Sequence, residues 1–232
     1  MKIFDIAQLA EADRVTVKKQ AITFQDLMER ASRLVFEEID SRLKGSQVPI
    51  KIFCGIGNNG GDGLVIGRLL MEHGYNVSVY VVNYSNKRAE DFLKSYDRIK
   101  EVGKWPTLLK SKEDFPALES KDFVVDAIFG IGLNRPLEDW VADLVKYINN
   151  SGAFIISVDM PSGLFSEKLS KDKDAVIKAN YTISFQAPKL VFFLPETAHY
   201  VGDLQVIDIG LDREFLQKAP YPWANQETGR KT

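Results

Sequence analysis

Two apolar spacings alternate along the chain. Residues 23–44 carry apolar side chains at every third or fourth position, which predicts an amphipathic helix. Thr23, followed three positions later by Asp26, is placed to cap its first turn, and Gly45 is placed to end it. A shorter helix is expected over 5–18. We interpret both helices as a packing layer or a subunit contact, with no chemistry visible in them.

From residue 49 onward, short apolar runs alternate with amphipathic segments, the order typical of a parallel sheet covered by helices. Strands are expected at 50–54, 76–82, 123–129, 153–158, 181–185, 191–194 and 204–209. Helices are expected at 64–73, 87–101 and 137–150. Residues 104–121 show little periodicity, and 166–178 read as a solvated loop. The sequence therefore predicts a three-layer α/β/α sandwich with a Rossmann-like, mostly parallel sheet and N-terminal helices.

The composition favours a single globular domain. Of the 232 residues, 45% are hydrophobic and 27% charged, so we expect one domain over 1–218 and a flexible tail over 219–232. With 30 Lys and Arg against 32 Asp and Glu, no charge excess favours nucleic acid or a membrane surface as a partner. We find no secretory signal and no run of membrane-spanning length, so a cytoplasmic location is expected. A single cysteine, Cys54, excludes an intrachain disulfide.

A glycine-rich stretch at 55–63 joins the first predicted strand to a helix. Gly55, Gly57 and Gly60 satisfy G-x-G-x-x-G in that context, where missing side chains let backbone amides approach a phosphate. The alternative is a tight turn that needs positive φ. Because the stretch also contains two carboxamides and a carboxylate, we expect something besides phosphate to be held there.

One feature of nicotinamide dehydrogenases is missing. Such folds normally place an Asp or Glu about twenty residues beyond the glycines, where it holds the ribose hydroxyls. Here the second strand ends in Val82-Asn83-Tyr84, and the next acidic residue, Glu90, is expected inside a helix. Hydride transfer is therefore disfavoured, and we expect a nucleotide bound in a different pose.

Three polar loops follow the carboxyl ends of predicted strands, where open parallel sheets bind ligands. They supply Asn58–Asp62, then Asp126 with the loop Gly130–Pro136, then Asp159 with Ser162. Each loop alone has a local explanation, such as a buried carboxylate satisfied by backbone amides or an Asx turn. Their coincidence at one edge favours a shared site.

The oxygen chemistry of these loops suits a hard cation. Asn59, Asp126 and Ser162 offer a carboxamide, a carboxylate and a hydroxyl, which favours a monovalent ion such as K⁺ because the set carries little charge for a divalent ion. Zinc is disfavoured, since the only histidines, His73 and His199, lie in no ligand-like cluster.

Five ordered motifs resemble the NAD(P)H-hydrate epimerase family (the YjeF N-terminal domain family). They are Leu-Met-Glu-Arg-Ala at 27–31, Gly-Ile-Gly-Asn-Asn-Gly-Gly-Asp-Gly at 55–63, Val-Val-Asp-Ala-Ile-Phe-Gly-Ile-Gly-Leu-Asn-Arg-Pro-Leu at 124–137, Val-Asp-Met-Pro-Ser-Gly at 158–163 and Gln-Ala-Pro-Lys at 186–189. The resemblance covers nearly the whole chain. It departs at Ser32, where the family commonly has glycine, and we expect this change to affect helix packing only.

The resemblance implies repair of a damaged cofactor. The R and S epimers at C6 of hydrated NADH or NADPH would be interconverted, so that an S-specific dehydratase can restore the cofactor. It implies substrate contacts from Asn58, Asn59, Gly60, Gly61, Asp62, Gly130, Ile131, Gly132, Leu133, Asn134, Arg135, Pro136 and Asp159. It also implies one K⁺ per subunit, bound by Asn59, Asp126 and Ser162, and a possible homodimer.

For the chemistry, we hypothesise acid-assisted loss of the hydroxyl group and return of water to the opposite face of the ring. Asp159 is the expected acid/base, assisted by Lys189. A surface lysine or a phosphate contact is the alternative for Lys189. Asp126 is a poorer acid, because a bound cation would keep it ionised.

Two other readings compete with the enzyme. A non-catalytic interaction module of the same fold resembles a domain of eukaryotic mRNA-decapping scaffold proteins, but retention of Asn59, Asp126, Asp159 and Ser162 argues against it. A hydride-transferring dehydrogenase ranks third. The dehydratase partner is expected to be a separate protein, or the chain is a fragment of a bifunctional one.

Overall fold

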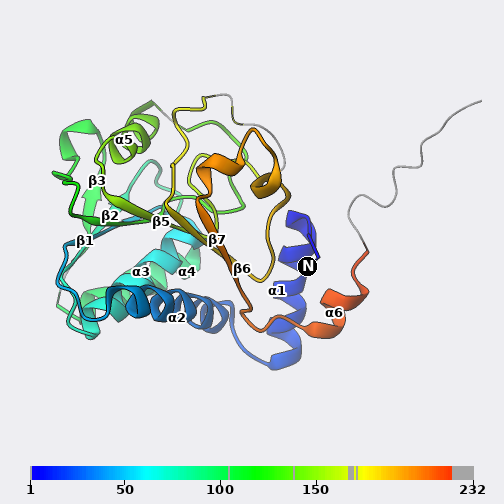
Figure 1. Cartoon of the computed structure of the whole chain (residues 1–232). Helices are drawn as coiled ribbons and strands as arrows, with labels where there is room; N and C mark the ends of the chain where they lie inside the picture. Colours follow the sequence, from blue (N-terminus) through cyan, green and yellow to red (C-terminus); the bar gives the residue numbers. More distant parts are fainter. Residues whose placement is uncertain (1, 104, 138, 167–169, 171, 221–232) are drawn as a thin grey trace, which may run out of the picture.

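The computed structural model describes residues 2–103, 105–137, 139–166, 170 and 172–220. The described strands form a seven-stranded sheet in the order β3-β2-β1-β4-β5-β6-β7, and neighbouring strands are parallel in all six pairings. Figure 1 shows this sheet between its helices. The strands are β1 (Ile50–Cys54), β2 (Val77–Val82), β3 (Thr107–Leu109), β4 (Phe123–Ala127), β5 (Phe154–Val158), β6 (Tyr181–Phe185) and β7 (Asp203–Ile207).

Helices cover both faces of this sheet, so the predicted three-layer sandwich is confirmed. The α-helices are α1 (Ile6–Gln20), α2 (Phe24–Leu43), α3 (Asn58–Glu72), α4 (Glu90–Glu101), α5 (Asp139–Asn149) and α6 (Arg213–Lys218). Figure 1 shows α2, α3 and α4 on one side of the sheet and α5 on the other. Short 3₁₀ turns are η1 (Lys112–Asp114), η2 (Leu190–Phe193) and η3 (Ala198–Tyr200).

Two apolar clusters hold the layers together. On one face, buried residues of α2 and α3, such as Val35 and Leu69, pack with Ile52 and Val125 of the sheet. On the other face, α5 buries Leu144 and its neighbours against the opposite side of the same strands. Strands buried on both faces read as continuous apolar runs, which is why the runs along the chain locate them.

The capping prediction for α2 is confirmed. The Thr23 hydroxyl accepts from the Asp26 amide, and the Asp26 carboxylate accepts from the Thr23 amide at 2.8 Å. The helix ends at Lys44, which adopts a left-handed conformation, and Gly45 follows with φ of 78°. Local sequence therefore sets both ends of this helix.

Some expected elements differ in the structure. The strand expected at 191–194 is wrong, because residues 190–193 form η2; Val191 and Phe192 pack into a separate small cluster under a loop, while Phe193 is 55% exposed. The weakly periodic stretch 104–121 contains β3 and η1. Short apolar runs do not reveal whether a strand neighbour exists, which explains the error.

The two ends of the chain are joined. The Lys2 ammonium donates to the Leu216 carbonyl at 3.0 Å, and the Gln8 carboxamide donates to the Pro220 carbonyl at 2.8 Å. The Asp212 amide donates to the Thr16 hydroxyl at 2.8 Å. Helix α6, which was not anticipated, thereby fixes α1 beside β6 and β7 (Figure 1). Most of the expected tail, residues 221–232, lies outside the described residues.

Helix α3 starts at Asn58, six residues earlier than expected, so part of the glycine-rich stretch is helix. A Cβ at Gly60 would lie 1.9 Å from the Gly55 carbonyl oxygen, and one at Gly63 would lie 2.6 Å from the Ala127 Cβ. None of the glycines between 55 and 63 has positive φ, so the tight-turn alternative is wrong. These glycines are needed for close approach of α3 to the sheet.

We expect Gly60→Ala to destabilise the fold by about 3 kcal/mol or more, because two backbone segments must separate to admit the methyl group. Gly57→Ala is the matched control, since a Cβ there meets no atom within 4 Å. That change should cost less than about 1 kcal/mol, within the range for changes at an N-cap. Urea unfolding of both variants measures the difference, and equal losses would contradict the close-approach argument.

Candidate functional site

The polar residues of the three loops meet where the strand order reverses. Because β1 connects to β2 on one side and pairs with β4 on the other, the switch point lies between β1 and β4. A Cβ at Gly130, just beyond β4, would lie 3.1 Å from Asp159 Oδ2 and 3.3 Å from Asn59 Cγ. The loop after β4 therefore lies between a residue of α3 and the residue that follows β5.

Asp126 is fully buried at the end of β4. Its carboxylate accepts from the hydroxyl of Ser162 at 2.5 Å and from the Ser162 amide and the Ser157 hydroxyl, both at 2.8 Å. Burial raises the pKa of this carboxyl, and these hydrogen bonds oppose the rise. The Ser162 oxygen also accepts from the Phe129 amide at 2.9 Å, so this pair ties the β5 loop to the β4 loop.

Asn59 is the unsatisfied member of the cluster. Its side chain is buried, yet among the described residues neither its amide nitrogen nor its oxygen has a hydrogen-bond partner. An unpaired buried amide is costly, and such an atom points to a bound ion, water or ligand. Among the described residues no group of three or more His, Cys, Asp and Glu gathers for a metal. The oxygens of Asn59, Asp126 and Ser162 suit a hard cation of low charge.

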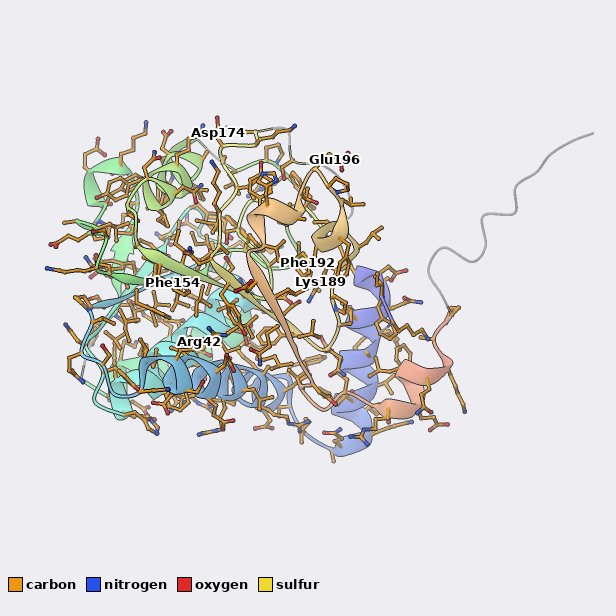
Figure 2. All side chains as sticks on the ribbon, in the orientation of Figure 1. Arg42, Phe154, Asp174, Lys189, Phe192 and Glu196 are labelled. Atoms are coloured by element: carbon orange, nitrogen blue, oxygen red, sulfur yellow. The ribbon has the colours of Figure 1, made fainter. Side chains whose placement is uncertain are left out.

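Asp159 and Lys189 form a buried ion pair. The Lys189 ammonium, on a residue only 4% exposed, lies 2.5 Å from Asp159 Oδ1 and also donates to the Ser184 hydroxyl at 2.7 Å. The second Asp159 oxygen accepts from the Ile131 amide at 3.4 Å. The surface-lysine alternative for Lys189, which Figure 2 labels, is therefore wrong, because its charge is held by the Asp159 carboxylate and by polar groups at the end of β6.

A member of this pair, Asp159, and a nearby residue, Gln186, have left-handed backbones although neither is glycine. Asp159 has φ of 65° directly after β5, and Gln186 has φ of 60° directly after β6. Hydrogen bonds hold both, from the Asp159 amide to the Ile183 carbonyl and from the Gln186 amide to the Ile207 carbonyl, each at 2.7 Å. Such conformations cost about 1–3 kcal/mol and concentrate at functional sites. The left-handed turn sets the Asp159 carboxylate beside Gly130, in the loop just beyond β4.

A cavity of about 320 Å³ opens beside α3. Asn58 and Asp62 line it from α3, and Phe185 lines it from the end of β6. The Phe185 backbone also contacts the ion pair, donating to Asp159 at 3.4 Å and accepting from Lys189 at 3.3 Å. The carboxyls of Asp13 on α1 and Asp91 on α4 line it too, and the other lining residues are apolar: Phe24, Leu27, Met28, Ala31 and Ile209. The cavity thus combines an apolar wall with polar groups of the glycine-rich stretch and two further carboxyls.

The loop Gly130–Pro136 spans two environments. Its first residues lie at Asp159, through Gly130 and the Ile131 amide. Leu133, Arg135 and Pro136 instead line a small separate hollow with Tyr84 and Phe129. The predicted substrate-binding loop therefore extends from the ion pair toward the end of β2, and its two halves do not converge on one point.

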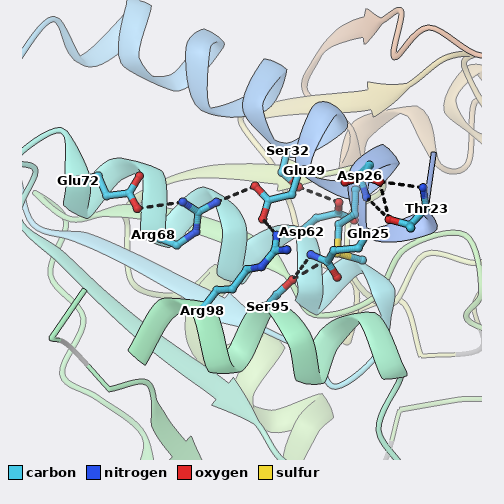
Figure 3. Close-up of polar contacts among 11 residues, drawn as sticks. Thr23, Gln25, Asp26, Glu29, Ser32, Asp62, Arg68, Glu72, Ser95 and Arg98 are labelled. Atoms are coloured by element: carbon cyan, nitrogen blue, oxygen red, sulfur yellow. Dashed lines mark hydrogen bonds and ion pairs between the residues drawn. The ribbon is translucent and has the colours of Figure 1, made fainter. Parts of the chain in front are cut away.

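Ser32 contacts the glycine-rich stretch directly. Its hydroxyl, on α2, donates to Asp62 Oδ1 at 2.9 Å (Figure 3). Burial raises the pKa of the Asp62 carboxyl well above its usual range, and this hydrogen bond opposes the rise. The expectation that serine at this position affects helix packing only is therefore wrong: it also supports the ionised form of a candidate binding residue.

Asp13 is the residue at the cavity that the sequence pattern did not single out. It lies on α1 and lines the cavity with Asp62. Burial, followed by the negative charge of Asp159, raises its pKa to about 6, while the charges of Lys189 and Arg14 oppose the rise. Its position in the helix could have identified it, because residue 13 falls one turn after Leu9 on the face that α1 buries.

Fold and site together define a Rossmann-like α/β protein with a buried polar cluster at the switch point of its sheet. The chain belongs to the family described as YjeF-related protein N-terminus, whose model matches residues 24–191.

Named relatives of similar and of greater length support this membership. An NAD(P)H-hydrate epimerase of Lentilactobacillus buchneri is 34% identical over 208 residues, which are 90% of this chain and 94% of that protein. The bifunctional NAD(P)H-hydrate repair enzyme Nnr of Thermofilum pendens is 34% identical over 94% of this chain, but the match spans only 42% of that longer protein. The crystal structure of a yeast protein, YNL200c, matches with a TM-score of 0.74, 25% identity and 98% coverage of both chains. None of the described helices has the length and apolar character that crossing a membrane requires.

We expect Ser32→Ala to raise the pKa of Asp62 further, because the hydroxyl that stabilises the ionised carboxylate is lost. Titration of the Asp62 carboxyl-carbon chemical shift measures this. Ser95→Ala is the control, since that hydroxyl contacts Gln25 and Met28 instead. An unchanged Asp62 titration in Ser32→Ala would contradict the assignment.

Proposed function

We propose that this chain is an NAD(P)H-hydrate epimerase, an isomerase that interconverts the R and S forms of hydrated NADH and NADPH in metabolite repair. The observation that carries the proposal is the buried ion pair of Asp159 and Lys189 beside the unsatisfied Asn59. Relatives matched over nearly their whole length bear the name of this activity. The absence of an acidic residue at the end of β2 fits this function better than hydride transfer.

The reaction needs proton transfer at a carbon that carries a hydroxyl group next to a ring nitrogen. Departure of the hydroxyl group as water leaves a ring with cationic character, and water returns to the opposite face. Asp159 is proposed to exchange protons at this carbon, and Lys189 to hold its carboxylate in place. Their enclosure strengthens the interaction with developing charge, because water is excluded around them.

The substrate is proposed to lie along the carboxyl ends of β1, β4 and β5. Asn58–Asp62 and Gly130–Pro136 would bind it on either side of Asp159. The close approach of Gly130 to both Asn59 and Asp159 supports this placement. Phosphate groups would find backbone amides at the start of α3, where the helix dipole favours negative charge.

A K⁺ ion, one per subunit, is proposed to bind Asn59, Asp126 and Ser162. The unpaired Asn59 oxygen and the buried Asp126 carboxylate support it, because a cation would satisfy the first and offset the burial cost of the second. When bound, the ion would supply fixed positive charge near the substrate and orient the loops that carry its ligands.

The longer relatives named as bifunctional repair enzymes support coupling to an S-specific NAD(P)H-hydrate dehydratase, as a second protein or a fused domain. A cytoplasmic homodimer remains our expectation for the working form. The alternative function is a non-catalytic interaction module of the same fold. A buried ion pair on a strained backbone favours the enzyme, since a scaffold has no use for that strain.

With R-enriched hydrated NADH and an S-specific dehydratase, we expect the chain to accelerate recovery of NADH absorbance well above spontaneous epimerisation. Asp159→Asn should lower that rate by about 10²-fold or more, because the proton-exchanging group is lost. Asp172→Asn, an exposed residue paired with Lys146, is the control. No acceleration by the wild-type protein would defeat the enzyme proposal, and full turnover by Asp159→Asn would defeat the role of that residue.

K⁺ in place of Na⁺ should raise the melting temperature by about 2 °C or more if the ion binds the folded state alone. Asn59→Ala should abolish this difference because it removes a ligand. Asn58→Ala, whose side chain is exposed, should keep it. Thermal unfolding in matched chloride buffers measures the effect, and equal melting temperatures in both salts for the wild-type protein would argue against a K⁺ site.

A further inference from the structure

We propose that Asp13 is a second catalytic acid/base of this chain, acting from the α1 wall of the cavity on the ring that Asp159 serves from the sheet. This inference rests on the proposed function and adds a residue to its chemistry. It places part of the active site in the N-terminal helix, which the sequence pattern treats as packing alone.

Asp13 lies on α1, at the wall of the cavity. It lines the same cavity of about 320 Å³ as Asn58 and Asp62, two residues of the glycine-rich stretch. Phe185 lines this cavity too, and its backbone contacts both members of the Asp159–Lys189 pair. Asp13 therefore lies on the α1 wall of this open cavity. The ion pair lies behind the Phe185 backbone at the ends of the strands, close enough for its charges to act on Asp13.

The Asp13 carboxyl is free to exchange protons. No described residue forms a hydrogen bond or ion pair with the Asp13 carboxyl, whereas Asp159 accepts from Lys189, Phe185 and Ile131. The Asp159 carboxylate in this pair can serve as the base that accepts a proton, and a carboxyl that faces the cavity without a partner can serve as the acid that donates one.

Charged groups near Asp13 affect its protonation. The charges that act on Asp13 come from Asp159 after β5, Lys189 after β6 and Arg14 on its own helix. The carboxyls of Asp62 on α3 and Asp91 on α4 line the same cavity. Burial and the charge of Asp159 outweigh the two cations and raise the pKa of Asp13 to about 6. An acid with a pKa near the working pH is well matched to general acid–base catalysis.

The proposed reaction requires a proton donor for the leaving hydroxyl group and a proton acceptor for the incoming water. In one direction, Asp13 donates a proton to the ring hydroxyl, the C–O bond breaks, water leaves with the bonding pair, and the ring nitrogen lone pair forms a C=N bond. Water then adds to the opposite face, its oxygen lone pair forming the new C–O bond, and its proton passes to Asp159. Asp159 then releases this proton to solvent, and solvent returns one to Asp13, so both carboxyls regain their starting states. The reverse direction exchanges the two roles, and no electron is gained or lost.

The apolar part of the cavity fits this use. Leu27, Met28 and Phe185 offer a flat wall for a ring, and the carboxyl groups nearby favour its transient positive charge. A volume of about 320 Å³ accommodates the reacting ring, and the rest of the dinucleotide extends outside along the strand ends.

The test compares Asp13→Asn with Glu11→Gln in the coupled assay on R-enriched hydrated NADH. Glu11 lies on the same helix, is exposed and pairs with Arg14, so its change removes a charge without touching the cavity. We expect Asp13→Asn to lower kcat about 10²-fold with little change in KM, and Glu11→Gln to keep the wild-type rate. The wild-type rate should fall above about pH 6, and this limb should vanish in Asp13→Asn.

A purely structural role for Asp13 would instead predict that Asp13→Asn lowers the free energy of unfolding. The folded state raises the pKa of Asp13, so its stabilising effect is complete below the unfolded value of 3.8 and is lost as pH rises through about 6. Asp13→Asn should therefore not lower the free energy of unfolding at pH 7. A wild-type protein without activity would defeat the proposed function and this proposal with it. An active wild type whose Asp13→Asn variant keeps its rate and pH profile would defeat this proposal alone.

Discussion

The closeness of α3 to the sheet is the constraint on which the rest of the site depends. A helix that begins this close to the ends of β1 and β4 must have glycine where it meets the Gly55 backbone, as at Gly60, and where it meets strand side chains, as at Gly63. The same approach carries the first polar side chains of α3 into the interior. Asn59 loses its water partners and the Asp62 carboxyl is buried. The unusual electrostatics of this region thus follow from helix packing before any ligand is considered.

Charge compensation then decides which buried groups keep their charge. Asp159 is enclosed with Lys189 and backbone amides, so its charge is balanced where it lies. Removing one partner of such a pair typically costs about 3–5 kcal/mol, because the other is left buried and unpaired. Asp13 has no such partner in the described part of the chain and instead lines the cavity. Two neighbouring carboxyls thereby have different surroundings.

The sequence made much of this architecture predictable, for identifiable reasons. The capping residues of α2 act locally, and parallel connections oblige the loops after β1, β4 and β5 to share an edge. Neither η2 nor β3 could be predicted, since a run of three or four apolar residues does not show whether a neighbouring strand pairs with it. Asp13 was missed because its surroundings depend on where α6 places α1, a contact between residues about 200 positions apart.

The contacts that hold α1 also bear on biosynthesis. Helix α1 is made about 200 residues before the carbonyls of Leu216 and Pro220 and the amide of Asp212 that anchor it. Until that later segment has left the ribosome, α1 lacks these partners, and the cavity wall it provides is not in place. A nascent chain can therefore complete its sheet first, and ligand binding in the cavity follows the docking of α6 onto α1.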